Sequence, residues 1–138
     1  MFYHCITRVV ERRFAFGADD KEKFRTLMRM YENFSGCRVV SYCLMCNHVH
    51  LLLEVPPMQE GGISDAELLK RLAVLYSEGF VAEVAKELGE ARELVNKGHA
   101  EEAYVKQIHE RFTYRMHDLG EFMKGLLQRF TQWFNRTQ

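Results

Sequence analysis

The stretch from His48 to Val55, HVHLLLEV, is the part of this chain that most restricts its fold. Side chains two apart on a β-strand share a face. One face of a strand over 48–55 is then wholly apolar and carries Val49, Leu51, Leu53 and Val55. The opposite face carries His48, His50, Leu52 and Glu54. The pattern predicts a half-buried strand in a sheet with one covered face.

The two histidines of this strand are its candidate functional residues. A strand rises about 3.3 Å per residue, so His48 and His50 lie roughly 7 Å apart along it. Two neutral imidazoles at that spacing can converge on one metal ion. Alternatively, they are polar residues on a solvent-exposed face without a ligand.

The residues before this strand predict a strand, a helix and a second strand. Residues 2–10 are rich in aromatic and β-branched residues, and so is the segment 37–45. Between them, a capping-box pattern of Asp19 and Glu22 opens an amphipathic helix that ends near Gly36. Its apolar residues recur at helical spacing and are Phe24, Leu27, Met28, Tyr31 and Phe34. Cys46 and Asn47 form the tight turn into the third strand.

The order strand, helix, strand, strand is the first part of the β-α-β-β-α-β pattern of ferredoxin-like folds. Residues 58–117 have no strand-like alternation, and their capping pattern at Ser64 opens a helical segment. A final amphipathic helix follows Asp118. We therefore expect an α/β (α+β) ferredoxin-like antiparallel sheet with helices on one face. We expect the core of the fold to be formed by residues 1–57 and 118–138. This core is incomplete at the C-terminus, because the fourth strand of the pattern is missing. Residues 58–117 are expected to be a helical insertion.

Charge is divided unevenly along the chain although its formal net value is zero. Residues 58–117 carry eight basic and eleven acidic side chains, whereas 1–57 carry eight and six. A polyanion is therefore expected to bind outside the acidic segment. No apolar run reaches the roughly 18 residues of a membrane span, and no signal peptide opens the sequence. The four cysteines are expected to be reduced thiols of a cytoplasmic protein.

A structural zinc site is an alternative for the histidine segment. Cys43, Cys46, His48 and His50 have the residue types that bind zinc tetrahedrally. Four ligands within eight residues strain that geometry, and the spacing is shorter than that of a zinc finger.

Four segments together resemble the IS200-like tyrosine transposases, in particular the REP-associated subgroup. They are YHCITRVV, FGADDKEKF, YCLMCNHVHLLLEVP and LGEFMKGLLQRFTQWFNR. The likeness covers residues 1–57 and 118–138. Its most specific part is NHVHLLLE, which has the His-hydrophobic-His form that names the HUH nuclease superfamily.

The resemblance implies a function for the chain. Such enzymes cleave and rejoin single-stranded or hairpin DNA, and a tyrosine hydroxyl attacks the phosphorus. It implies Mg²⁺ or Mn²⁺ held by His48 and His50, which polarises the scissile phosphate. Association into a homodimer is a further expectation. A hairpin-binding protein without catalysis is the alternative.

The resemblance places the nucleophilic tyrosine and a third metal ligand beyond Gln138, so no tyrosine of this chain is assigned as catalytic. Tyr31 and Tyr42 are expected in the core, whereas Tyr104 and Tyr114 have no assigned role. Arginine forks suit phosphate oxygens. The expected DNA contacts are Arg8, Arg12, Arg13, Arg129 and Arg136.

Overall fold

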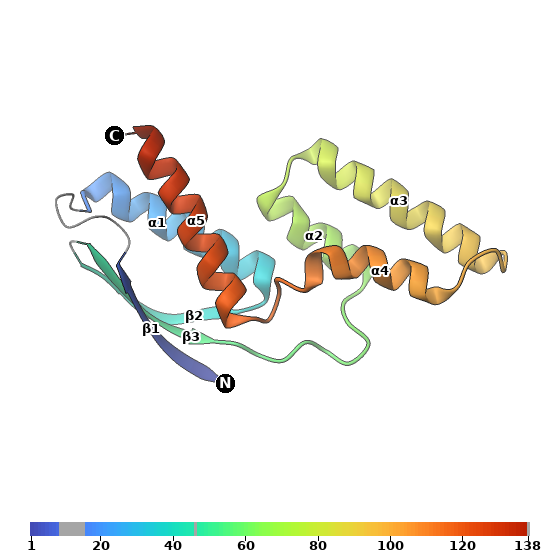
Figure 1. The fold of residues 1–138 in the computed structure, drawn as a ribbon, viewed down its shortest axis with the longest axis horizontal. Coiled ribbons are helices and arrows are strands. Elements are labelled where there is room, and N and C mark those ends of the chain that lie inside the picture. Colours follow the sequence, from blue (N-terminus) through green and yellow to red (C-terminus); the bar gives the residue numbers. More distant parts are fainter. Residues whose placement is uncertain (9–15, 46, 138) are drawn as a thin grey trace.

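A computed structural model of the chain describes residues 1–8, 16–45 and 47–137, and Figure 1 shows its fold. Within these residues, three strands precede a series of helices, with one helix between the first two strands. The strands are β1 (Phe2–Arg8), β2 (Arg38–Leu44) and β3 (His48–Glu54). The helices are α1 (Ala18–Ser35), α2 (Asp65–Leu75), α3 (Glu78–Asn96), α4 (Glu102–Thr113) and α5 (Leu119–Thr137).

The strands form one antiparallel sheet in the order β1-β3-β2. The strand with the two histidines is therefore central, with a neighbour along each edge. Arg8 of β1 lies opposite His48, and Cys43 of β2 lies opposite His50. The predicted α/β class and the antiparallel sheet with helices on one face are confirmed, since α1 and α5 lie on the same side of the sheet (Figure 1).

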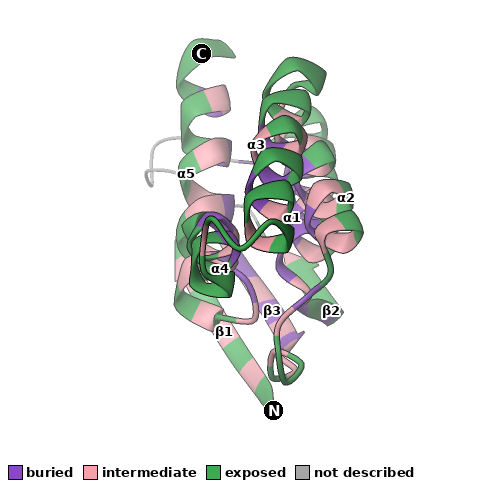
Figure 2. Ribbon diagram, turned by 90° about the vertical axis from the view of Figure 1, so that its right-hand side faces the viewer, coloured by how far each residue is buried: buried purple, intermediate pink, exposed green. Residues whose placement is uncertain are grey.

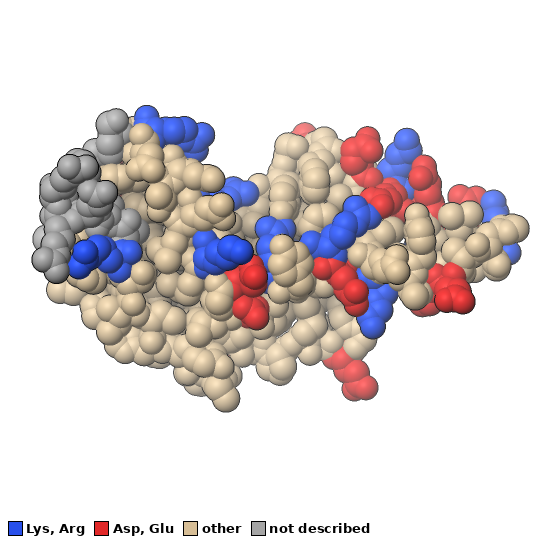
Figure 3. All heavy atoms as spheres, in the orientation of Figure 1, with Lys and Arg blue, Asp and Glu red and all other residues tan. Residues whose placement is uncertain are grey.

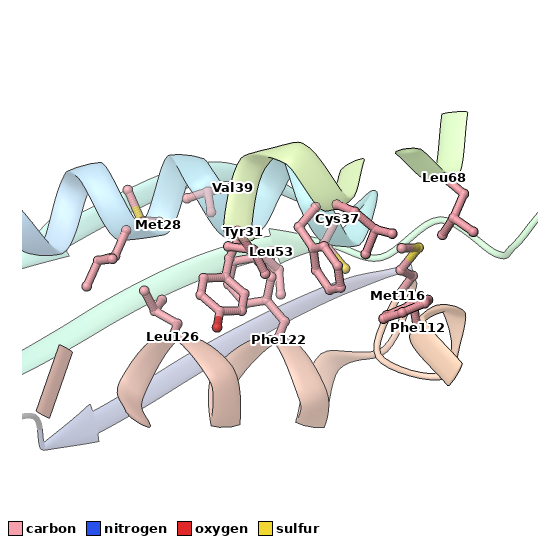
Figure 4. Close-up of a cluster of buried hydrophobic side chains, with 14 of the residues drawn as sticks. Met28, Tyr31, Cys37, Val39, Leu53, Leu68, Phe112, Met116, Phe122 and Leu126 are labelled. Atoms are coloured by element: carbon pink, nitrogen blue, oxygen red, sulfur yellow. The ribbon is translucent and has the colours of Figure 1, made fainter. Parts of the chain in front are cut away.

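The core lies between the sheet and these two helices. Val49, Leu51 and Leu53 of β3 are completely buried, as the alternation predicts. Figure 2 shows buried residues gathering between the helices and the sheet, and Figure 4 shows their side chains meeting. The helices contribute a set of large apolar side chains that are fully buried, namely Phe24, Met28, Phe122, Leu126 and Phe130. Five such residues at helical spacing explain why α1 and α5 bury one face each.

One of the two tyrosines expected in the core is not there. Tyr31 of α1 is buried, but Tyr42 of β2 is 36% exposed. Tyr42 pairs with Leu51, so its side chain leaves the sheet on the helix side. It lies on an edge strand, where the Arg29 guanidinium covers its ring at 5.6 Å. The expectation for Tyr42 is therefore wrong, because the residue lies on an edge strand and a charged side chain lies over its ring.

The start of α1 also differs from the predicted capping box at Asp19 and Glu22. The helix begins at Ala18, and the carboxylate of Asp20 accepts a hydrogen bond from the Gly17 amide at 2.8 Å. The N-cap therefore lies two residues earlier than predicted, and only the Asp20 half of a capping box forms because Gly17 has no side chain. The Glu22 carboxylate pairs with Arg25 instead. The predicted end is confirmed, since Gly36 has φ of 76°, a conformation that glycine adopts without steric cost.

The caps predicted for two later helices are present. The Ser64 hydroxyl accepts a hydrogen bond from the Glu67 amide at 3.0 Å, and the Asp118 carboxylate accepts one from the Glu121 amide at 2.8 Å. Residues 58–117 contain α2, α3 and α4. Of these, α2 packs against α1, while α3 and α4 extend away from the sheet (Figure 1). No helix in the described ranges is long and apolar enough to cross a membrane.

His117 joins this helical segment to the core. Its backbone has φ of 53°, and its amide donates to the Ser35 carbonyl at 2.7 Å. Its ring bridges two other segments, with Nδ1 2.8 Å from the Pro56 carbonyl and Nε2 3.2 Å from the Arg71 guanidinium. The ring also lies against Gly36, where an added Cβ would come within 2.5 Å. His117 thus links the residues at the end of α1 to those that precede α5.

Candidate functional site

His48 and His50 lie on the uncovered face of the central strand. Both are half-buried and alternate with the fully buried Val49 and Leu51. The predicted arrangement, with both imidazoles on one face and the aliphatic residues beneath the helices, therefore agrees with the observed burial pattern. Because β3 is paired along both edges, the backbone of the two histidines is held on both sides.

Asn47 fixes the ring of His48. The side-chain Oδ1 of Asn47 lies 2.7 Å from Nδ1 of His48. An amide oxygen can only accept a hydrogen bond, so in the neutral imidazole the proton lies on Nδ1 and Nε2 has the lone pair. Histidines that bind metals commonly donate their second N–H to such an acceptor, which sets the tautomer and the ring orientation. In this tautomer His48 could bind a metal ion through Nε2.

A third imidazole, His4 of β1, lies beside the pair, and sequence reasoning missed it. The ring centroids of His4 and His50 are 5.7 Å apart and the rings are tilted by 31°. The burial of β1 alternates, with His4 on its exposed set. That alternation could have placed His4 on one face of its strand, but only the pairing of Ile6 with His50 brings the two rings together. Register between distant strands is not encoded by the period of either strand alone.

The expected DNA-contacting arginines do not share one surface. Arg8 is exposed and lies opposite His48 across the β1–β3 ladder, so it belongs to the histidine face. Arg12 and Arg13 lie outside the described residues. Arg129 is on α5, in the helix layer, and donates to the Leu75 carbonyl at 3.1 Å. Arg136 is near the end of the same helix, where it donates to the Gln132 carbonyl at 3.3 Å.

The donor set of this face suits a metal with open coordination positions. Cys43 is exposed and lies opposite His50, while Cys46 falls outside the described ranges. Among the His, Cys, Asp and Glu residues described, no three are grouped so that they could hold one ion. His48 and His50 thus offer two nitrogen ligands, and a metal there would have to take further ligands from solvent or substrate. Such an arrangement fits a catalytic metal better than a closed structural site.

Acidic side chains gather away from the sheet. In Figure 3 they lie mostly over the end formed by α3 and α4, while the sheet end in this view is largely free of them. Part of this acidity is neutralised internally. Asp65 at the start of α2 binds the Arg92 guanidinium through two contacts of 3.0 and 3.1 Å, and Nε2 of His109 lies 2.7 Å from its Oδ1. The hydrogen bonds from Arg92 lower the pKa of the Asp65 carboxyl, and His109 adds to the effect.

Comparison with known families identifies the chain. The family described as Transposase IS200 like matches residues 1–77, more than half of the sequence. This range contains β1, α1, β2, β3 and α2, and with them both histidines and Asn47. The chain therefore belongs to the IS200-like transposase family. No curated protein and no solved structure matches it.

Proposed function

We propose that this chain takes part in metal-assisted cleavage and rejoining of single-stranded or hairpin DNA, with His48 and His50 as the metal ligands. The observation that carries the proposal is the half-buried pair of imidazoles on the open face of a rigid central strand. Membership of the IS200-like transposases supports DNA as the substrate and transposition as the process.

The residues of the histidine face have separable tasks in this proposal. Bound Mg²⁺ or Mn²⁺ would supply positive charge to the oxygens of the scissile phosphate. His48 and His50 would hold that charge in place, and the Asn47 contact would hold the neutral His48 ring in the tautomer whose Nε2 has the lone pair. Arg8 lies directly opposite His48 on the neighbouring strand and would bind a neighbouring phosphate of the same DNA strand. These groups orient the phosphodiester, and such positioning supplies a large part of the rate in phosphoryl transfer.

The nucleophile of the proposed reaction is assigned to none of the six tyrosines of the chain. Tyr3 and Tyr42 are the two in the sheet, and they pair with Leu53 and Leu51, whose side chains lie on the buried face. Tyr104 and Tyr114 are exposed but belong to the segment between α3 and α5. A second candidate function follows from this placement: the chain binds hairpin DNA and leaves the attacking hydroxyl to another polypeptide segment or a second copy.

Metal binding tests the shared basis of both candidates. We expect the 138-residue protein to bind Mn²⁺, and His48→Ala and His50→Ala each to abolish that binding while circular dichroism shows an unchanged fold. His99→Ala is the matched control, because His99 is exposed and lies between α3 and α4. Mn²⁺ affinity that survives in both histidine variants contradicts the assignment of the site.

A covalent DNA adduct separates the two candidates. The chain is incubated with single-stranded hairpin DNA and Mn²⁺, and protein–DNA species are resolved under denaturing conditions. Binding without an adduct supports the second candidate. An adduct that disappears in Tyr104→Phe or Tyr114→Phe would instead identify a nucleophile within this chain, and a rate that rises with the square of protein concentration would show that two copies are needed.

A further inference from the structure

A small cavity lies in the helix layer, away from the histidine face. Its volume is 180 Å³, and its walls come from α1, from the turn after α4 and from α5. Tyr31 belongs to the first wall, Arg115 to the second, and Lys124 and Gln128 to the third. Small-molecule pockets are usually about 300–1,000 Å³, so this cavity fits a single small group.

Arg115 presents a fixed guanidinium at this cavity. Its charged carbon lies over three aromatic rings, 4.9 Å from the centroid of Phe34, 5.7 Å from Tyr76 and 5.9 Å from Tyr114. One terminal nitrogen donates to the Tyr76 hydroxyl. These contacts hold the side chain without a carboxylate, so little conformational entropy remains to be lost when it binds an anion.

The Nε–H group of Arg115 is a buried donor without a partner in the described part of the chain. Buried N–H groups without a protein partner are rare in folded proteins, so this guanidinium keeps an unused hydrogen-bond donor. Arg115 also forms no ion pair with a described carboxylate, whereas six other arginines of the described ranges do. Those that pair with carboxylates are Arg25, Arg29, Arg38, Arg71, Arg92 and Arg111.

Gly125 shapes the opposite wall. A Cβ on this residue would lie 2.5 Å from the Tyr31 ring, so glycine lets the ring lie against the backbone of α5. Figure 4 shows the Tyr31 hydroxyl directed toward that helix. Burial raises the pKa of the Tyr31 hydroxyl, and this effect outweighs the lowering by the charges of Arg129 and Arg115. The hydroxyl therefore stays neutral and can donate a hydrogen bond.

The charges around the cavity favour an anion. Lys124 is exposed at its rim and makes no ion pair with any described carboxylate, although Glu121 also lines the space. Two cationic side chains, two tyrosine hydroxyls and one amide thus face a single carboxylate. Oxygen atoms of a tetrahedral anion in the cavity could accept hydrogen bonds from the Arg115 guanidinium and the Lys124 ammonium group together.

We propose that this cavity binds a phosphate group, with Arg115 as the fixed donor and Lys124 as the countercharge at the rim. Two sources share this chemistry, namely a phosphate of the DNA backbone and free inorganic phosphate. The cavity belongs to the helix layer and the histidine pair to the open face of the sheet, so the proposal stands or falls independently of metal binding at His48 and His50.

The Arg115 Nε–H resonance in ¹⁵N–¹H spectra reports directly on this unused donor. We expect it to shift on addition of inorganic phosphate and on addition of a single-stranded oligonucleotide, without Mn²⁺. Lys124→Gln should weaken both responses. A lost contact removes about 0.7 from the salt slope of single-strand binding, which is about fivefold in affinity at 0.1 M salt. Lys86→Gln, an exposed substitution on α3, should leave both unchanged.

Each result decides the proposal. Shifts with both probes, weakened in Lys124→Gln alone, identify a site for backbone phosphate. A shift with inorganic phosphate but none with the oligonucleotide identifies free phosphate as the ligand. Absence of any shift with either probe, or equal weakening in Lys86→Gln, overturns it. Arg115→Gln should abolish the phosphate response, and Lys124→Gln keeps the test decisive if Arg115→Gln does not fold.

Discussion

Asn47 accepts a hydrogen bond from the ring of the residue that follows it, His48, over 2.7 Å. The contact joins the last residue of the β2–β3 turn to the first residue of β3, and the turn is closed by the Met45 amide and the His48 carbonyl at 2.9 Å. The turn thus does more than reverse the chain, because it also sets which ring nitrogen of His48 is available.

Replacing Asn47 with alanine should weaken metal binding without unfolding the protein. Removing the acceptor frees the His48 ring to rotate and to change tautomer, and losses of about 10- to 100-fold in metal affinity are typical for such partners. Isothermal titration with Mn²⁺ measures the change. Asn135→Ala, at an exposed position of α5, is the control and should bind as the wild type does. Equal affinity in Asn47→Ala would mean that the hydrogen bond has no part in the site.

The two faces of β3 should differ sharply in their response to truncation. Leu51 is fully buried beneath the helices, so Leu51→Ala should lower the free energy of unfolding by about 2–5 kcal/mol. Leu52 lies on the histidine face and is only half-buried, so Leu52→Ala should cost less than about half as much. Urea denaturation of both variants measures the difference. Equal losses would show that the histidine face is also covered.

Arg8 should contribute to DNA binding through charge. Its guanidinium is exposed beside His48, so Arg8→Gln should lower affinity for single-stranded DNA irrespective of sequence and reduce the salt slope by about 0.7. Arg38→Gln is the comparison on the same sheet, where Arg38 already pairs with Glu54 at 2.9 Å. Fluorescence anisotropy over a range of salt concentrations gives both slopes. An unchanged slope in Arg8→Gln would remove this residue from the DNA-binding surface.

Gly125→Ala should destabilise the protein even though alanine is the better helix former. The gain of about 1 kcal/mol in helix propensity is opposed by the overlap of the new methyl group with the Tyr31 ring, which typically costs 1–3 kcal/mol. Gly89→Ala, in α3, offers the matched control, because nothing lies within 4 Å of its added Cβ. Thermal unfolding should show a raised midpoint for Gly89→Ala and a lowered one for Gly125→Ala. A rise in both would mean that Tyr31 moves aside freely.

The Asp65 carboxylate should make the stability of the helical segment depend on acid pH. Its pKa is lowered in the folded state, chiefly by Arg92, so its contribution is complete above the unfolded value of about 3.9 and is lost as pH falls through the folded value. Asp65→Asn should therefore be less stable by about 1 kcal/mol at pH 7, and the difference should shrink below about pH 4. Urea midpoints at pH 7 and pH 3 test this. A constant difference at both values would show that the loss does not depend on the charge of the Asp65 carboxylate.

The sequence predicts those features that depend on local periodicity. The faces of β3 follow from strict alternation, and the cap of α2 follows from Ser64 and Glu67. The features it misses depend on how distant segments meet. Tyr42 is exposed because β2 is an edge strand whose register shifts between Val39 and Ser41, and no strand carries that information by itself.

The same limit applies to the functional residues. His48 and His50 are two apart on one strand, so their common face can be read directly. His4 reaches His50 only through the β1–β3 register, and Arg115 reaches Tyr31 only through the packing of α1 against the segment after α4. Contacts of this kind require a three-dimensional structure.

The central position of β3 has a consequence for amide hydrogen exchange. An edge strand can detach by breaking one ladder, whereas β3 must lose both before its amides meet solvent. The amides of Val49 and Leu51 should therefore exchange only through global unfolding, more slowly than those along the outer edges of β1 and β2. The imidazoles of His48 and His50 are attached to the part of the backbone that opens last, so thermal fluctuation that frays the sheet edges leaves their spacing unchanged.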